Sequence, residues 1–144
     1  MATVYAVAVI YVIGIYRPPG YIISHFERIE IKSASVSKSM HTYFIYITFA
    51  NTGNADTSID SILLNGVPYD DSSWTGTIRP TIFGDITAGT FIKSEGGSDH
   101  LGIIYFSDDC VYIPGGYSLT AGLTVKITIH TTGGKDYDTS VTLP

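Results

Sequence analysis

The sequence predicts an all-β sandwich, and three observations support this fold class. Val, Ile, Thr, Tyr and Phe gather in short runs, and these residues suit the pleated, half-buried surface of a strand. Turn residues separate the runs roughly every eight to twelve positions. No stretch keeps a helical period of apolar residues over about ten positions. With 144 residues the chain fits one domain.

The first element is residues 4–16, VYAVAVIYVIGIY, which carry no charge and no amide side chain. As a helix this segment would span ~20 Å, short of the ~30 Å hydrocarbon core of a bilayer. Pro18 and Pro19 prevent such a helix from continuing. A signal peptide needs a basic start, and nothing basic precedes Val4. The Val, Ile and Tyr content instead favours a strand.

This strand is apolar on both faces, so it needs cover on both sides. Fully extended it would reach ~43 Å, longer than the strands of one compact domain. We therefore expect residues 4–16 to leave their own domain and to add as a strand to a neighbouring copy, because strand addition combines backbone pairing with side-chain pockets. The large apolar side chains expected at this polymerisation interface are Val4, Tyr5, Val7, Val9, Ile10, Tyr11, Val12, Ile13, Ile15 and Tyr16.

The expected linker is Arg17, Pro18, Pro19 and Gly20. Residues 1–20 are thus the donor strand and linker, and residues 21–144 are the sandwich domain. Two alternatives compete with donation. The segment is the first strand of its own sandwich, or it forms a buried or membrane-associated helix, as in a filament core. Without an evident leader, the numbering is expected to begin at or near a mature N-terminus, although Met1 can equally be a start codon.

The strands of the sandwich follow the linker. Residues 26–36 alternate, with Ile29 and Ile31 on one face and charged side chains on the other, which predicts a half-exposed strand. Residues 42–50 are apolar on both faces and predict a central strand, which ends in turn residues at 51–56.

The next strand, residues 57–64, runs into Asn65 and Gly66, which tolerate the positive φ angles of a type I′ turn and predict a tight hairpin. Pro68 lacks an N–H group, which places the return strand at a sheet edge. Further strands are predicted at residues 75–78, 90–93, 101–106, 111–113, 123–130 and 137–143. The last two flank the loop 131–136 as a hairpin. About seven or more short strands at this spacing are typical of an immunoglobulin-like sandwich, here with an extended N-terminal strand.

Two runs of the sequence resemble a known group of proteins. YITFANTGNADTSIDSILLNGVPY, residues 46–69, and LTVKITIHTTGGKDYDTSVTLP, residues 123–144, are similar to the β-sandwich domains of archaeal extracellular filament subunits, meaning pilins, archaellins and thread-like filament proteins. The resemblance implies a structural, cell-surface subunit that polymerises with copies of itself through its N-terminal apolar segment. Pilins and archaellins carry a long N-terminal helix there. Because residues 4–16 are short, β-prone and followed by Pro-Pro, the thread-like arrangement, with donor strand complementation, is favoured.

Charge and motifs argue against other classes. Charged residues make up only 15% of the chain, and eight Lys and Arg against thirteen Asp and Glu give a net charge of −5 without a basic run. Nucleic acid is therefore not an expected partner. The chain has no G-x-S-x-G, P-loop or G-x-G-x-x-G motif. We expect no enzyme, no catalytic residue and no cofactor.

No metal site is expected either. Three carboxylate pairs lack the EF-hand spacing and are predicted to be solvated turns. They are Asp70 with Asp71, Asp108 with Asp109, and Asp136 with Asp138. The four histidines lack the spacing of zinc ligands. Cys110 is the only cysteine, which leaves no intramolecular disulfide and predicts a small core residue.

Two further hypotheses belong to other classes. A monomeric adhesion or carbohydrate-binding sandwich would show an exposed cluster that includes Trp74 and several of the eleven tyrosines. A membrane-anchored envelope domain would use residues 4–16 as its anchor. No N-x-Ser/Thr sequon occurs, so N-glycosylation is not expected, whereas exposed Ser and Thr could carry O-linked sugar.

Overall fold

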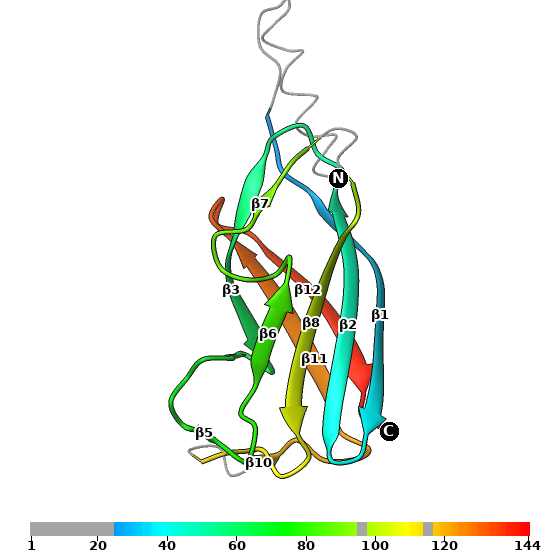
Figure 1. The fold of residues 1–144 in the computed structure, drawn as a ribbon. Helices are drawn as coiled ribbons and strands as arrows, with labels where there is room; N and C mark the ends of the chain where they lie inside the picture. The colour runs from blue at the N-terminus through cyan, green and yellow to red at the C-terminus, as the bar shows by residue number, and fades with distance from the viewer. Residues whose placement is uncertain (1–24, 95–97, 114–116) are drawn as a thin grey trace, which may run out of the picture.

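The computed structural model describes residues 25–94, 98–113 and 117–144, which form an all-β, antiparallel fold with no helix (Figure 1). The all-β prediction is confirmed. The expected donor strand, residues 4–16, and the linker, residues 17–20, lie outside the described residues.

Two sheets form the layers of the fold, and a small third sheet lies at the lower end in Figure 1. The front sheet has the order β1 (Ile29–Ser39), β2 (Thr42–Asn51), β8 (His100–Ser107) and β6 (Thr81–Gly84). The back sheet has the order β12 (Asp136–Thr142), β11 (Thr124–Thr131), β3 (Thr57–Leu64) and β4 (Val67–Pro68), and β7 (Phe91–Ile92) also pairs with β3. The third sheet joins β10 (Tyr117–Ser118), β9 (Val111–Tyr112) and β5 (Trp74–Thr75).

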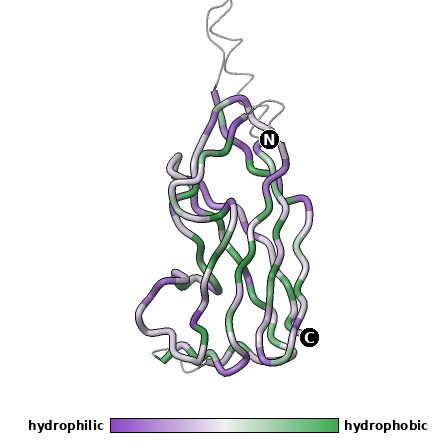
Figure 2. Tube along the Cα trace, in the orientation of Figure 1, coloured by the Kyte–Doolittle hydropathy of each residue, from purple (hydrophilic) through white to green (hydrophobic). Residues whose placement is uncertain are grey.

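Alternate residues of the long strands point between the two large sheets and form one core. In β2, Ile45, Ile47 and Phe49 are fully buried, and Ile127 and Ile129 of β11 belong to the same cluster. Figure 2 shows hydrophobic residues, in green, along the long strands. Burying each such side chain contributes roughly 1.5–3 kcal/mol, so this cluster is the main source of stability.

Most of the long strands lie where the sequence predicts them. The predicted strands 42–50, 57–64, 101–106, 123–130 and 137–143 each match an observed strand to within one residue at either end. β2 lies between β1 and β8, as its two apolar faces predict. Asn65 and Gly66 have φ angles of 52° and 83°, and Pro68 lies in the edge strand β4, so the tight hairpin is confirmed.

A bulge changes the alternation in β1. Ile31 pairs with Phe49 and Ser33 pairs with Thr48, which leaves Lys32 as an extra residue between them. The phase shifts by one residue, so Ala34 and Val36 join Ile31 against the core, and the serines between them face outward.

The predicted strand 75–78 is mostly wrong, because only Trp74–Thr75 forms a strand there. Beyond it, the N–H of Thr77 donates to the carboxylate of Asp109 at 3.0 Å, and the N–H of Ile78 donates to Ser107 Oγ at 2.9 Å. Side chains thus take the donors that a neighbouring strand would need. The short strands β6 and β10 have no counterpart in the prediction.

Candidate functional site

The predicted assembly residues, 4–20, all lie outside the described residues, and the described feature that follows them is the place where the chain enters the sandwich. We call residues 26–28 the entry segment and residues 51–55, between β2 and β3, the clamp loop. Figure 1 places this entry at the upper end of the sandwich and the C-terminus at the lower end. Whatever force acts on the N-terminal segment must pass through the entry segment.

The clamp loop binds the backbone of the entry segment. Phe26 N donates to Asn54 Oδ1 at 2.8 Å, and Phe26 O accepts from the N–H groups of Asn54 and Ala55, both at 2.9 Å. Arg28 O accepts from Thr52 N at 2.8 Å. Main-chain groups on both sides of Glu27 are therefore paired before β1 begins.

Asn51 connects this clamp to the rest of the sandwich. Its side chain is buried, and its Oδ1 accepts from Arg28 N at 3.1 Å and from Gly53 N at 3.0 Å. Its Nδ2 donates to Ala55 O at 2.8 Å and to Ile92 O at 3.3 Å. One amide thus joins the entry segment, the clamp loop and β7. Such fully paired buried amides fix local geometry.

Gly53 allows the close approach of the two segments. A Cβ at this position would overlap the carbonyl oxygen of Phe26 and would lie 2.8 Å from Arg28 N. The glycine of the NTG turn is therefore required for packing of the clamp loop on the entry segment, and the motif has a structural meaning that its turn propensity alone does not reveal.

The side chain of Glu27 fixes the entry segment to the opposite layer. Glu27 is 7% exposed, and its Oε2 accepts from Thr131 Oγ1 at 2.6 Å and from Tyr137 OH at 3.0 Å. These hydroxyls belong to β11 and β12. A Cβ at Gly133 would overlap Glu27 Oε1, so the glycine-containing turn leaves room for the carboxylate.

Electrostatics keep Glu27 ionised. Burial by itself raises the pKa of Glu27, but its interactions with Thr131, Thr57, Tyr137 and Lys135 together outweigh this effect and hold the pKa below the usual value of 4.5. Burial, together with the hydrogen bond to Glu27, raises the pKa of Tyr137 to about 12, so the phenol remains a donor. The Glu27 carboxylate and the Tyr137 phenol therefore keep the protonation states that their hydrogen bond needs across the neutral pH range.

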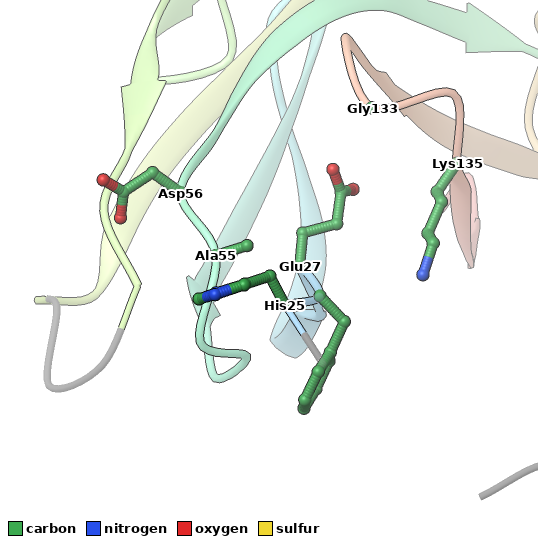
Figure 3. A pocket seen from close by; sticks show the side chains of 7 residues that line it. His25, Glu27, Ala55, Asp56, Gly133 and Lys135 are labelled. Carbon is green, nitrogen blue, oxygen red and sulfur yellow. The ribbon is translucent and has the colours of Figure 1, made fainter. Parts of the chain in front are cut away.

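A shallow pocket of about 270 Å³ lies beside the entry segment (Figure 3). It is lined by His25, Phe26, Glu27, Ala55, Asp56, Gly133 and Lys135. In Figure 3 the Glu27 carboxylate points toward the turn at Gly133, while Asp56 points away from it. Asp56 accepts from the N–H and hydroxyl of Ser94 at 2.7 and 2.9 Å. Both acids beside this pocket accept hydrogen bonds from neighbouring side chains.

Two of the predicted carboxylate pairs, Asp70 with Asp71 and Asp108 with Asp109, lie in or beside turns. Asp136 and Asp138 instead lie in β12, so the prediction of a solvated turn is wrong for this pair. Asp71 accepts from Ser73 N at 2.8 Å, and Asp109 accepts from Thr77 Oγ1 at 2.7 Å. Asp108 pairs with Lys38, and Asp138 accepts from Thr128. Among the residues that the structure describes, no three His, Cys, Asp or Glu side chains gather closely enough to hold a metal ion.

Cys110 and Trp74 both lie in the core. Cys110 is fully buried and burial raises its pKa to about 11, so the prediction of a small core residue is confirmed. Trp74 is 1% exposed, donates from Nε1 to Pro68 O at 3.0 Å and packs on Tyr112. The expected exposed cluster around Trp74 is therefore wrong, because the third sheet covers this ring.

Sequence reasoning missed a different apolar surface, the outer face of the front sheet. Phe83 is 66% exposed there, Leu101 48% and Tyr46 36%, and Phe44 stacks on Tyr105 with ring centroids 5.9 Å apart. The one signal was that residues 42–50 are apolar on both faces. That signal predicted only that β2 is central in its sheet; among the described residues its inner face is covered and its outer face is exposed.

Models of known families and characterised proteins were compared with the chain, and none of them matches it. In the described part of the chain, no helix is long and apolar enough to cross a membrane.

Proposed function

We propose that this chain is the structural subunit of an extracellular filament, a helical homopolymer that grows head to tail as each copy donates residues 4–16 to a neighbour. The observation that carries the proposal is the entry segment. Its backbone is held by the clamp loop and its one buried carboxylate by the opposite sheet. An N-terminal extension that transmits tension between subunits requires such a firm attachment.

The arrangement of the domain supports a heterologous contact. The chain enters at one end of the sandwich and leaves at the other (Figure 1). If the N-terminal segment of one copy binds a different surface on the next copy, the contact is heterologous. When the rotation between successive copies does not close a ring, such contacts build a helical filament. We include in this proposal an immunoglobulin-like topology, no enzymatic activity, and surface or glycan contacts along the filament.

The position of the apolar run, in front of the residues that form the core, also supports donation. The core cluster of the described residues runs from Ile29 to Leu143, and residues 4–16 add a further uncharged apolar run in front of it. Such a run in water is a template for aggregation unless a partner covers it. A neighbouring copy is a partner that is always present at equal concentration.

The test compares the full chain with residues 21–144 by negative-stain microscopy and sedimentation. The full chain is expected to form fibres, and residues 21–144 are expected to stay monomeric with an unchanged circular dichroism spectrum. Fibres of residues 21–144 would show that donation is wrong. An exposed-aromatic adhesin would instead keep its glycan binding after the truncation and would form no fibres in either form.

A further inference from the structure

The two edges of the front sheet differ in length. β6 has four residues, whereas β1 has eleven, and no strand formed by the described residues lies beyond β1 in the sheet order. A long open edge exposes a row of unpaired N–H and C=O groups and invites another strand. β1 is thus the most extended edge of this sheet among the described residues.

The register shows which backbone groups of β1 are open. A two-residue turn joins Ser39 to Thr42, and the pairs Ser37 with Phe44 and Ser35 with Tyr46 follow. In such a hairpin these serines exchange hydrogen bonds with β2, and the residues between them direct their N–H and C=O groups away from it. Ala34 and Val36 therefore present their main chain to the open edge.

The side chains of β1 leave room beside this edge. Ser33, Ser35 and Ser37 face outward and are exposed, and they are small. The neighbouring outward positions on β2 are Phe44 and Tyr46, which continue into the apolar outer face. Because these serine side chains are small, they leave a shallow strip on the surface, which we call the lane. The larger side chains of Phe44 and Tyr46 border this strip, and we call them the ridge. Large side chains of an added strand can lie over this lane and contact the ridge.

The inner side of the same edge is incompletely covered. Ile31, Ala34 and Val36 of β1 and Tyr137 of β12 pack against the core but stay partly exposed, and β1 and β12 lie in contact across the two layers. An added strand at β1 would cover these side chains. The added strand therefore needs apolar residues on both of its faces. One face contacts these partly exposed side chains, and the other face contacts the serine lane.

We propose that residues 4–16 of a neighbouring copy pair with the open edge of β1 along residues 33–37. This inference rests on the proposed function, since it names the acceptor for the donated strand. The segment is uncharged, carries large side chains on both faces and is long enough to cover the lane. Lys32, paired with Asp99, and Lys38, paired with Asp108, stand at the two ends of the lane and limit pairing to the uncharged stretch between them.

The other edges fit this donor less well. β12 directs Asp136, Asp138 and Ser140 outward, so an uncharged strand there would lie beside carboxylates. β6 is preceded by Pro80, which has no N–H to offer, and it provides only four residues. β4 has two residues. Only β1 combines length, an uncharged outer lane and partly exposed inner side chains.

The test uses residues 21–144 as a cap for growing filaments of the full chain. This fragment contains the whole described core, keeps the acceptor edge and lacks the donor. In excess, the wild-type fragment should bind exposed donor segments and shorten the fibres seen by negative-stain microscopy. Ser35→Glu places a charge in the lane and should weaken capping at least about tenfold, since the charge must be covered by an apolar strand. Ala34→Pro removes an outward N–H and should act in the same direction.

Ser140→Glu is the matched control, an exposed serine on the edge strand of the back sheet, and it should cap as the wild type does. Thermal melting of each fragment confirms that it is folded. If Ala34→Pro does not fold, the capping result for Ser35→Glu is sufficient to test the β1 assignment. Capping by the wild type and by every variant would overturn the β1 assignment and leave strand donation standing. Failure of the wild-type fragment to cap, together with fibres formed by that fragment alone, would overturn both.

Discussion

Gly53 is the residue whose role in the entry is clearest. A methyl group there overlaps Phe26 O and crowds Arg28 N, so Gly53→Ala must displace the clamp loop. We expect a loss of about 1–3 kcal/mol in the free energy of unfolding, the usual range for overpacking at a tight contact. Urea denaturation measures it. Thr52→Ala removes only the exposed hydroxyl that donates to Arg28 O at 3.3 Å and creates no overlap, so it should cost less, at most about 1 kcal/mol. Equal stability of the two variants would contradict the clamp.

Glu27 makes a prediction about pH. Its folded pKa lies below 4.5, so its ionised form stabilises the fold above that value, and this contribution is lost as the pH falls through the folded pKa. Glu27→Gln replaces one acceptor oxygen by a donor beside two hydroxyls, and should lose about 1–3 kcal/mol at neutral pH.

The measurement is urea unfolding of wild type and Glu27→Gln between pH 7 and pH 3. The gap between the two proteins should narrow as the pH falls below about 4.5. Glu30→Gln is the control, because Glu30 lies exposed on the outer side of β1 and its loss should have little effect at any pH. A gap that stays constant with pH would show that the charge of Glu27 is not what stabilises the entry.

At the scale of elements, His130 joins three strands of the back sheet. From β11 its Nδ1 bonds to Asp136 of β12, and its Nε2 lies 3.5 Å from Asp60 of β3. The hydrogen bond to Asp136 raises the pKa of His130 above 6.5. Its contribution is therefore complete below about pH 6.5 and is lost as the pH rises through the folded pKa, the opposite sense to Glu27.

His130→Gln should therefore lower stability at pH 5 and have little effect at pH 9. The loss should be at most about 1 kcal/mol, because the ion pairs are largely exposed. Thermal unfolding at the two pH values measures it, with His25→Gln as a control for an exposed imidazole elsewhere. A larger effect at pH 9 than at pH 5 would contradict the ion pairs as the cause.

The elements that the sequence predicts correctly are those set by local chemistry. Asn65 and Gly66 determine their turn without reference to the rest of the chain, and the alternation of apolar residues in β11 predicts which of its side chains are buried. The strand predicted at 75–78 fails because Asp109, distant in the sequence, captures the N–H of Thr77. The bulge at Lys32 was not predicted for a similar reason, because the pairing of β1 with β2 determines where the bulge lies.

At the scale of the whole molecule, the clamp at the entry could not be predicted from the sequence. The sequence predicted residues 51–56 only as a turn and residues 26–36 only as a half-exposed strand, and neither prediction indicated that Glu27 is buried. Only the fold brings the clamp loop, the Gly133 turn and Tyr137 to the same end of the sandwich. The apolar outer face was likewise hidden, because exposure of Phe83 and Leu101 depends on which strands lie next to one another.

Net charge gives the last prediction. Each copy carries a net charge of −5, while the proposed contact between donor segment and β1 lane is uncharged. Copies therefore repel one another at long range and attract only at contact. Raising the ionic strength from about 0.01 to 0.15 M shortens the screening length from roughly 30 to 8 Å, so elongation should accelerate several-fold.

Light scattering during assembly measures this acceleration. Sodium chloride and sodium sulfate at equal ionic strength separate screening from salting-out, because sulfate additionally strengthens apolar burial. An acceleration common to both salts reflects repulsion between like-charged copies, and any excess in sulfate reflects burial of the donor segment. If both salts slowed elongation, attraction between charged groups would have to drive assembly, and an uncharged strand contact could not be its main cause.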